Sequence, residues 1–294
     1  MNAISRGDRI LNATITLAII LVGLLTAYPL VYIVSASFSS PRAVTTGQVL
    51  LWPVDVSLQG YKAVFRDPNF MIGYRNTIFY TLSGTFLNVA LTLAAAYPLS
   101  RQELPGKRLI LWFFSFTMLF SGGLIPSYML MNGLGLINTV WAMLLPGAIV
   151  VYNLFITRTF LCTSIPLELL EAAQIDGCSD FRYFFSILLP LSKPVIAVIA
   201  LYYAVGHWNA YFNAFLYLTD RRLFPLQLIL RDILISNKIN TATIVDPELM
   251  EIQQGMADLL KYALIVVSSA PILCLYPLIQ RHFTKGMMIG SLKG

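Results

Sequence analysis

Long apolar runs alternate with short polar segments along the whole chain, and six of these runs are long enough to cross a membrane. A helix that spans the hydrocarbon core of a bilayer needs about 20 mainly apolar residues. The six runs lie at roughly 11–35, 77–99, 109–131, 137–160, 195–218 and 262–280. The pattern therefore predicts an all-α integral membrane protein with six transmembrane helices.

The composition supports this prediction. Of the 294 residues, 57% are hydrophobic and 12% are charged, whereas a typical soluble domain carries about 25% charged residues. The net charge of +6 does not indicate a nucleic-acid partner, because nucleic-acid binders gather Lys and Arg on one exposed face. Here these residues mostly flank the apolar runs, as they do in membrane proteins. We therefore expect membrane lipid, and no nucleic acid, as a partner.

The basic residues also predict the orientation, because short cytoplasmic segments are enriched in Lys and Arg. Such residues occur in both terminal tails and in the connection at 100–108: Arg6, Arg9, Arg101, Lys107, Arg108, Arg281, Lys285 and Lys293. We expect a multi-pass protein of the cell (inner) membrane with the N- and C-termini and the loop at 161–194 in the cytoplasm. The segments 39–75 and 219–261 then face outward.

The sequence offers little chemistry of its own. Its cysteines and histidines, which are Cys162, Cys178, Cys274, His207 and His282, lack the spacing of metal ligands, so we expect no metal site, no catalytic residue and no enzyme. Outside their flanks the six runs contain no Asp, Glu, Lys or Arg, although ion-coupled transporters place such groups within the membrane. The chain also lacks the Gly-x-x-x-x-Gly-Lys-Ser/Thr phosphate cradle. Uphill transport would therefore need a partner ATPase.

The loop after the fourth apolar run is polar and helix-prone. Ser164 is placed to cap a helix that begins near Pro166, and Gly177 is placed to end it in the left-handed conformation. Ser179 is then placed to cap a second, aromatic helix over Asp180–Leu189. We expect a short helix that stands out from the membrane, braced by the aromatic helix. An amphipathic connector lying at the lipid headgroups is the alternative.

The same loop carries a spaced set of residues: Glu171, Ala172, Ala173, Asp176, Gly177, Phe184, Ile187 and Pro190. This set resembles the EAA loop of ABC-importer permeases. Asn76-Thr77 and the tail at 283–294 resemble the carbohydrate-uptake branch, and in particular the second permease subunit of the maltose-importer type. The tail is most similar to permeases for complex oligosaccharides, the alginate-type group. The resemblance implies a MetI-like ABC importer permease fold over most of the chain.

The resemblance also implies a function and partners. It identifies the chain as the transmembrane permease subunit of an ATP-driven oligosaccharide importer. The residues implied to couple it to the ATPase are Glu171, Ala172, Ala173, Asp176, Gly177 and Pro190. The implied complex contains a homologous permease in a heterodimer, two ATPase subunits that hold ATP and Mg, and an extracytoplasmic solute-binding protein, while this chain binds no cofactor. A stand-alone ion-coupled or passive carrier and a membrane scaffold are the alternatives.

Two further groups are candidates for contact with the solute or the binding protein. Pockets for sugars combine apolar walls with a few polar groups, and the fifth apolar run offers Tyr203, His207, Trp208, Asn209, Tyr211 and Asn213 as a substrate path. An interfacial aromatic belt combined with helix packing is the alternative. In the next outer loop, Arg221 and Arg222 are candidates for binding-protein contact and for pairing with the carboxylate of an acidic sugar. The alternative is two solvated arginines.

We predict no separate soluble domain. Residues 1–75 would form the N-terminal tail, the first transmembrane helix and an outer loop. Residues 76–280 would form the core permease transmembrane domain, with the cytoplasmic EAA loop at 161–194 and an outer loop at 219–261. Residues 281–294 would form a cytoplasmic C-terminal tail.

Overall fold

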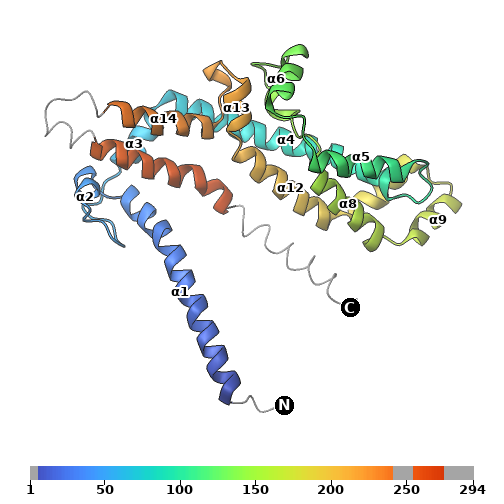
Figure 1. Cartoon of the computed structure of the whole chain (residues 1–294), viewed down its shortest axis with the longest axis horizontal. Coiled ribbons are helices and arrows are strands. Elements are labelled where there is room, and N and C mark those ends of the chain that lie inside the picture. Colours follow the sequence, from blue (N-terminus) through green and yellow to red (C-terminus); the bar gives the residue numbers. More distant parts are fainter. Residues whose placement is uncertain (1–5, 241–253, 275–294) are drawn as a thin grey trace. The chain divides into compact units, whose positions relative to one another are not determined.

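The computed structural model describes residues 6–240 and 254–274, which are mainly helical and contain no β-strand (Figure 1). The predicted all-α class is thus confirmed. The chain divides into two compact units. One comprises Met1–Pro68 and Leu230–Pro271, and the other comprises Asn69–Ile229 and Ile272–Gly294.

In the first unit, short helices pack against the long helix Gln254–Cys274. It contains α1 (Arg6–Ser37), α2 (Pro41–Thr45), α3 (Gln59–Arg66), most of α14 (Leu226–Asn240) and the helix Gln254–Cys274 up to Pro271. Ala36, Val44 and Leu259 are buried together. Gly60 on α3 approaches the last helix so closely that a Cβ there would lie 2.9 Å from Leu259 Cγ. The absence of a side chain at Gly60 permits this contact.

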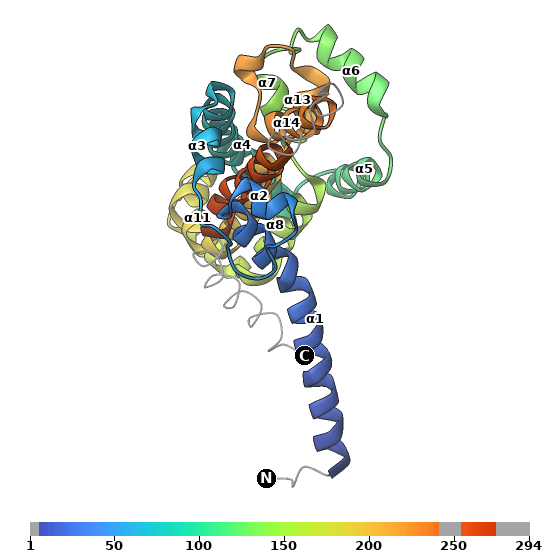
Figure 2. The ribbon, with the colours of Figure 1, turned by 90° about the vertical axis from the view of Figure 1, so that its left-hand side faces the viewer.

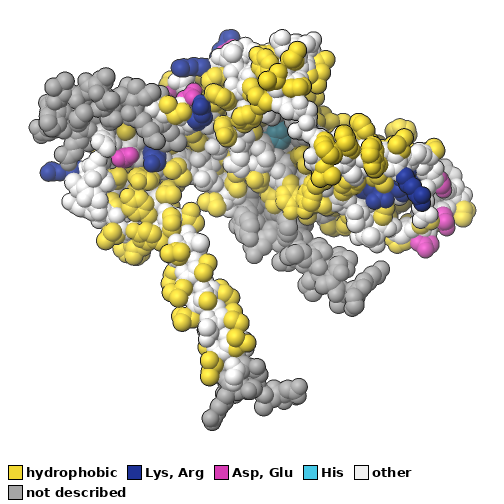
Figure 3. Space-filling view, viewed as in Figure 1, with side chains coloured by type: hydrophobic (Ala, Val, Ile, Leu, Met, Phe, Trp, Pro, Cys, Tyr) yellow, Lys and Arg dark blue, Asp and Glu magenta, His cyan; other side chains and the backbone are white. Residues whose placement is uncertain are grey.

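Most of α1 exposes apolar side chains, which Figure 3 shows in yellow along the helix. The exposed fraction is 66% for Ile19 and 76% for Leu25. A continuous apolar surface of this length is costly in water, and a bilayer supplies the apolar surroundings that it needs. We therefore assign Ile10–Ser37, which has a mean hydropathy of 2.4, to a membrane span.

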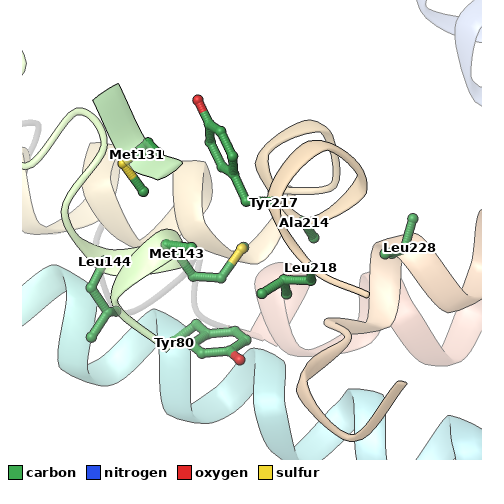
Figure 4. Packing of buried hydrophobic residues seen from close by; sticks show 9 residues of the cluster. Tyr80, Met131, Met143, Leu144, Ala214, Tyr217, Leu218 and Leu228 are labelled. Atoms are coloured by element: carbon green, nitrogen blue, oxygen red, sulfur yellow. The ribbon is translucent and has the colours of Figure 1, made fainter. Parts of the chain in front are cut away.

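The second unit contains the remaining helices. They are α4 (Pro68–Ser100), α5 (Lys107–Leu119), α6 (Leu124–Gly133), α7 (Trp141–Leu144), α8 (Val151–Ser164), α9 (Leu167–Ile175), α10 (Asp180–Tyr183), the π-helix η1 (Phe184–Leu188), α11 (Leu189–Leu191), α12 (Lys193–Trp208), α13 (Phe212–Tyr217), the 3₁₀-helix η2 (Arg221–Leu223) and the start of α14. Figure 4 shows one of its cores, where Tyr80 of α4 lies beside Met143 of α7 and Leu218. Since these residues come from distant parts of the sequence, this core holds α4, α7 and the segment after α13 together.

Three uninterrupted helices in the described part of the chain meet the length and hydropathy of a membrane span: Ile10–Ser37, Pro68–Ser100 and Gln254–Cys274. Two bent pairs of helices also have the length and hydropathy of a span when each pair is taken together. The third apolar run is α5 and α6, which are bent by 114° relative to each other (Figure 2), and Gly123 at the bend has a positive φ of 86°. The fifth run begins at an 80° bend between Asp180–Leu191 and Lys193–Trp208.

The fourth apolar run is not the continuous helix that the sequence predicts. It contains α7 and, after a break at 145–150, the 14-residue α8. The break has a local cause, because Pro146 lacks a backbone donor and Gly147 has a φ of 74°, in the left-handed region. Up to five spans are therefore recognised in the described residues, and the fourth predicted span, 137–160, is the broken α7–α8 segment. The sixth predicted span, 262–280, falls within Gln254–Cys274 as far as residue 274, and its remaining residues lie outside the described part of the chain.

A ladder of polar side chains runs along α4. Near its start, Asn76 Nδ2 donates to the carbonyls of Arg222 and Phe224 at 2.7 and 3.0 Å. Further along, Asn88 Nδ2 lies 3.1 Å from His207 Nε2, and the hydroxyls of Thr92 and Tyr203 are 2.7 Å apart. These pairs join α4 to the η2 region and to α12. Each buried polar group that gains a partner in this way avoids the penalty of desolvation.

Candidate functional site

The predicted EAA loop contains a short, sharply bounded helix, α9. It starts at Leu167, with Pro166 as its N-cap residue and Glu168 in its first turn. Ser164 is not the cap that we predicted, because it is the last residue of α8. Pro166 lies one residue before the helix, where its missing N–H costs nothing.

The end of α9 is confirmed at Gly177, which has a φ of 71°. The Cys178 N–H donates to the Ala173 carbonyl at 2.9 Å and the Gly177 N–H donates to the Gln174 carbonyl at 3.0 Å. These two bonds form a Schellman motif, which satisfies carbonyls that the helix would otherwise leave unpaired. Cys178 also packs against the core that contains Ala173. The loop therefore turns at a defined point.

One face of α9 is buried in the second unit. Leu170 and Ala173 are 6% and 7% exposed and lie in a core with Leu99 of α4, Leu161 of α8 and Tyr183 of α10. The small side chain of Ala173 belongs to this inner face. Among the predicted coupling residues, Ala173 therefore faces the helix bundle and not the exposed surface of α9.

The opposite face of α9 is open. Glu171, Ala172 and Asp176 are exposed, and Ile175 is 86% exposed. In Figure 3, acidic side chains gather at the end of the second unit that carries α9. An exposed apolar and acidic face on a helix with a fixed inner face is suited to a groove on another protein.

The segment after α9 is only partly the aromatic brace that we predicted. The Ser179 side chain accepts from the Arg182 N–H, which confirms the predicted cap. Tyr183 is buried, whereas Phe181 and Phe185 are 80% and 62% exposed. The second helix therefore braces the bundle through Tyr183 and leaves two aromatic rings on its outer surface.

Pro190, another predicted coupling residue, is exposed in the first turn of α11. The helix just before it is a π-helix, in which the Leu189 N–H bonds to the Phe184 carbonyl. Proline has no N–H and crowds the preceding turn of a regular helix. The wider turn of the π-helix before Pro190 accommodates the proline ring and the missing N–H.

Two contacts that join the end of α4 and the residue after it to α10 could not be predicted from the sequence. Arg101 Nη2 pairs with Asp180 Oδ1 at 3.0 Å, and the Tyr97 hydroxyl donates to the same oxygen at 3.3 Å. The Arg101 guanidinium also lies 5.4 Å from the centre of the Tyr97 ring. Arg101 is separated from Asp180 by 79 residues, so no local pattern in the sequence links them.

The residues of the predicted substrate path divide into two groups. Tyr203, His207 and Trp208 contact α4, through Thr92, Asn88 and Tyr74 respectively. By contrast, Asn209 and Tyr211 are exposed and Asn213 is half-buried. The sequence does carry a signal for the first group. Asn88 and Thr92 are polar residues four positions apart within an apolar run, so they lie on the same face of α4 and can bond a neighbouring helix.

The two arginines of the outer loop also differ. Arg222 forms a bidentate pair with Asp220, in which Nε donates to Oδ1 at 3.1 Å and Nη2 donates to Oδ2 at 2.7 Å. Hydrogen bonds from the Arg222 side chain and backbone lower the pKa of Asp220. Arg221 is exposed beside this pair. Asp220 therefore provides a counter-charge to only one of the two predicted contact residues.

The chain was compared with known proteins. Residues 70–289 match the family described as "Binding-protein-dependent transport system inner membrane component". Protein LplC of Bacillus subtilis is 42% identical over 273 residues, covering 93% of this chain and 91% of the relative. The polygalacturonan/rhamnogalacturonan transport system permease protein YtcP of the same organism is 38% identical over 290 residues, covering 98% of this chain and 99% of the relative.

A solved structure is also similar. The crystal structure of a bacterial ABC transporter involved in the import of the acidic polysaccharide alginate contains a chain that is 33% identical, with a TM-score of 0.85. The match covers 96% of this chain and 100% of that chain. The predicted carbohydrate-permease resemblance and the predicted fold are confirmed. The chain belongs to the binding-protein-dependent transport system inner membrane components, the non-catalytic permeases of ABC importers.

Proposed function

We propose that this chain is one of two permease subunits of an ATP-driven oligosaccharide importer. It forms the translocation path with a homologous permease and receives solute from an extracytoplasmic binding protein. Its α9 docks on one of two ATPase subunits, which hold ATP and Mg. Both termini lie in the cytoplasm. The family membership supports this assembly, and the two-sided surface of α9 supports the point of coupling.

The observation that carries the coupling proposal is the division of α9 into two faces. Leu170 and Ala173 fix the inner face to α4, α8 and α10, while Glu171 and Asp176 remain exposed. A helix fixed on one side transmits the displacement of a partner to the helices behind it. The Schellman motif at Gly177 fixes the point at which α9 ends, and so fixes how its two faces are oriented relative to the bundle.

The proposed solute is an oligosaccharide that contains acidic sugars. YtcP is named for polygalacturonan and rhamnogalacturonan, and the similar solved structure is named for an acidic polysaccharide. Exposed Arg221 offers a guanidinium to a carboxylate. On the membrane path itself, we propose Asn209, Tyr211 and Asn213 as direct contacts, because Tyr203, His207 and Trp208 already contact α4.

Reversing the charge of Glu171 in the assembled complex tests the coupling. Glu171→Lys should reduce both sugar uptake and the stimulation of ATP hydrolysis by loaded binding protein by roughly tenfold, which corresponds to about 1.4 kcal/mol. Glu103→Lys is the matched control, because Glu103 is also exposed but lies outside α9. Normal uptake and normal ATPase stimulation with Glu171→Lys would refute the coupling proposal.

A stand-alone carrier is the competing function, and a separate experiment distinguishes it. The purified chain is reconstituted alone in vesicles without any ATPase, and accumulation of labelled oligosaccharide is followed. We expect no accumulation against a gradient. Accumulation driven by an ion gradient would replace the importer by the carrier.

A further inference from the structure

A cavity of about 310 Å³ lies in the second unit, behind α9. Its walls come from the ends of α4 and α8, the connection before α5, and α9 itself, which contributes Leu167 and Leu170. Three cationic side chains line it: Arg101, Lys107 and Arg158. No acidic residue is among its lining residues. The lining of the cavity therefore carries positive charge and no carboxylate.

The charge of this cavity is only partly neutralised. Among the residues that the structure describes, Asp180 is the carboxylate that forms an ion pair with one of these cations, Arg101. Lys107 Nζ donates to the Arg101 carbonyl at 2.8 Å, and Arg158 Nε donates to the Leu99 carbonyl at 3.0 Å. Backbone carbonyls orient these two cations but do not cancel their charges. Two positive charges are left for a ligand.

Arg101 provides the second observation. Its side chain is 16% exposed, with Nη2 on Asp180, and its buried Nη1 has no hydrogen-bond partner. An unpaired buried donor on a charged group is costly, and a bound anion would remove that cost. The unsatisfied donor and the excess of positive charge thus indicate the same kind of ligand.

We propose that this cavity binds a phosphate group. A phosphate presents oxygens in several directions and accepts from several cations at once, and arginine binds it in a bidentate manner. A free phosphate and the headgroup of an anionic phospholipid share this chemistry, and basic pockets between membrane helices bind such headgroups. Bound phosphate would link Arg101, Lys107 and Arg158, and hence the elements that support α9. This inference is independent of the proposed solute and partners.

Cys162 gives a direct measurement, because it lines the cavity and its side chain is exposed. In full-length protein with Cys178→Ser and Cys274→Ser, Cys162 is the sole thiol. Its reaction rate with a neutral maleimide is measured in detergent with sodium phosphate or sodium chloride at equal ionic strength. It is also measured in vesicles of phosphatidylcholine, with and without phosphatidylglycerol. We expect the rate to fall at least fivefold in the phosphate arm, the phosphatidylglycerol arm, or both.

The two arms distinguish the source of the phosphate. Protection by phosphate in detergent indicates a free anion, and protection by phosphatidylglycerol alone indicates a lipid headgroup. Lys107→Gln and Arg158→Gln should each abolish the protection, whereas Lys107→Arg should keep it. Arg108→Gln is the matched control, since Arg108 is adjacent and exposed but does not line the cavity. No protection in either arm, or equal loss with Arg108→Gln, would overturn the proposal.

Discussion

The imidazole ring of His207 on α12 lies directly over Gly84 on α4. A Cβ at position 84 would overlap three atoms of that ring, and the ring is also held by Asn88, whose Nδ2 lies 3.1 Å from Nε2. The glycine and the histidine are therefore a matched pair, in which the missing side chain of one provides room for the other.

The first prediction follows from this pair. Gly84→Ala forces His207 out of its position and should destabilise the protein by about 1–3 kcal/mol, as other overpacked contacts do. Thermal unfolding in detergent, followed by circular dichroism, measures the loss. The double variant Gly84→Ala/His207→Ala should recover part of it, because the overlapping ring is gone. Equal additive losses would show that the two positions do not interact.

The second prediction concerns the end of α9. Gly177 has a φ of 71°, a conformation that costs a β-branched residue about 1–2 kcal/mol. Gly177→Val should therefore unwind the Schellman motif and lower ATPase stimulation in the assembled complex. Gly177→Asn should retain most of the stimulation, because asparagine tolerates this conformation better. Equal stimulation in both variants would contradict the role of the left-handed turn.

The third prediction separates packing from solute contact in α12. The Tyr203 hydroxyl accepts from the Val150 N–H at 3.1 Å and bonds Thr92 at 2.7 Å. Tyr203→Phe leaves both partners unpaired and should cost about 1–3 kcal/mol of stability, measured by thermal unfolding. The KM for sugar uptake should stay unchanged. Tyr211→Phe is the matched control, and its stability should be close to that of the wild type because Tyr211 is exposed.

The fourth prediction uses the difference between the two outer arginines. Arg221→Ala should weaken uptake of an acidic oligosaccharide by roughly tenfold, or about 1.4 kcal/mol, and leave a neutral one unaffected. Arg222→Ala should instead loosen the η2 turn, because Arg222 pairs with Asp220, and should therefore affect both sugars alike. Uptake kinetics with the two substrates decide between these outcomes. Equal effects of Arg221→Ala on both sugars would remove the acidic-sugar argument.

Local features of the fold were predictable from the sequence. Gly177 and Ser179 bound their helices as predicted, because left-handed glycines and serine caps act within a few residues. Ser164 failed as a cap since α8 continues through it. The helical pattern of the fourth apolar run likewise hid the break at Pro146 and Gly147, which hydropathy alone does not detect.

Long-range features were not predictable. The partner of Arg101 is 79 residues away, and Arg101 served in the sequence analysis only as an indicator of membrane orientation. Tyr203 and His207 were interpreted as solute contacts because their chemistry suits sugars, but it suits Thr92 and Asn88 equally well. Which of two suitable partners a polar side chain meets depends on the packing of helices, and the composition of one helix does not contain that information.

The polar ladder on α4 also limits how the second unit moves. Asn76 holds one end of this helix to the backbone of the η2 region, while Thr92 holds a point four turns later to Tyr203. Sliding α4 along its neighbours would break these bonds at both places in one step, and at Thr92 and Tyr203, inside the predicted spans, the bilayer core holds no water to replace the lost bond. The polar ladder therefore opposes a displacement of α4 along its own axis relative to the η2 region and α12.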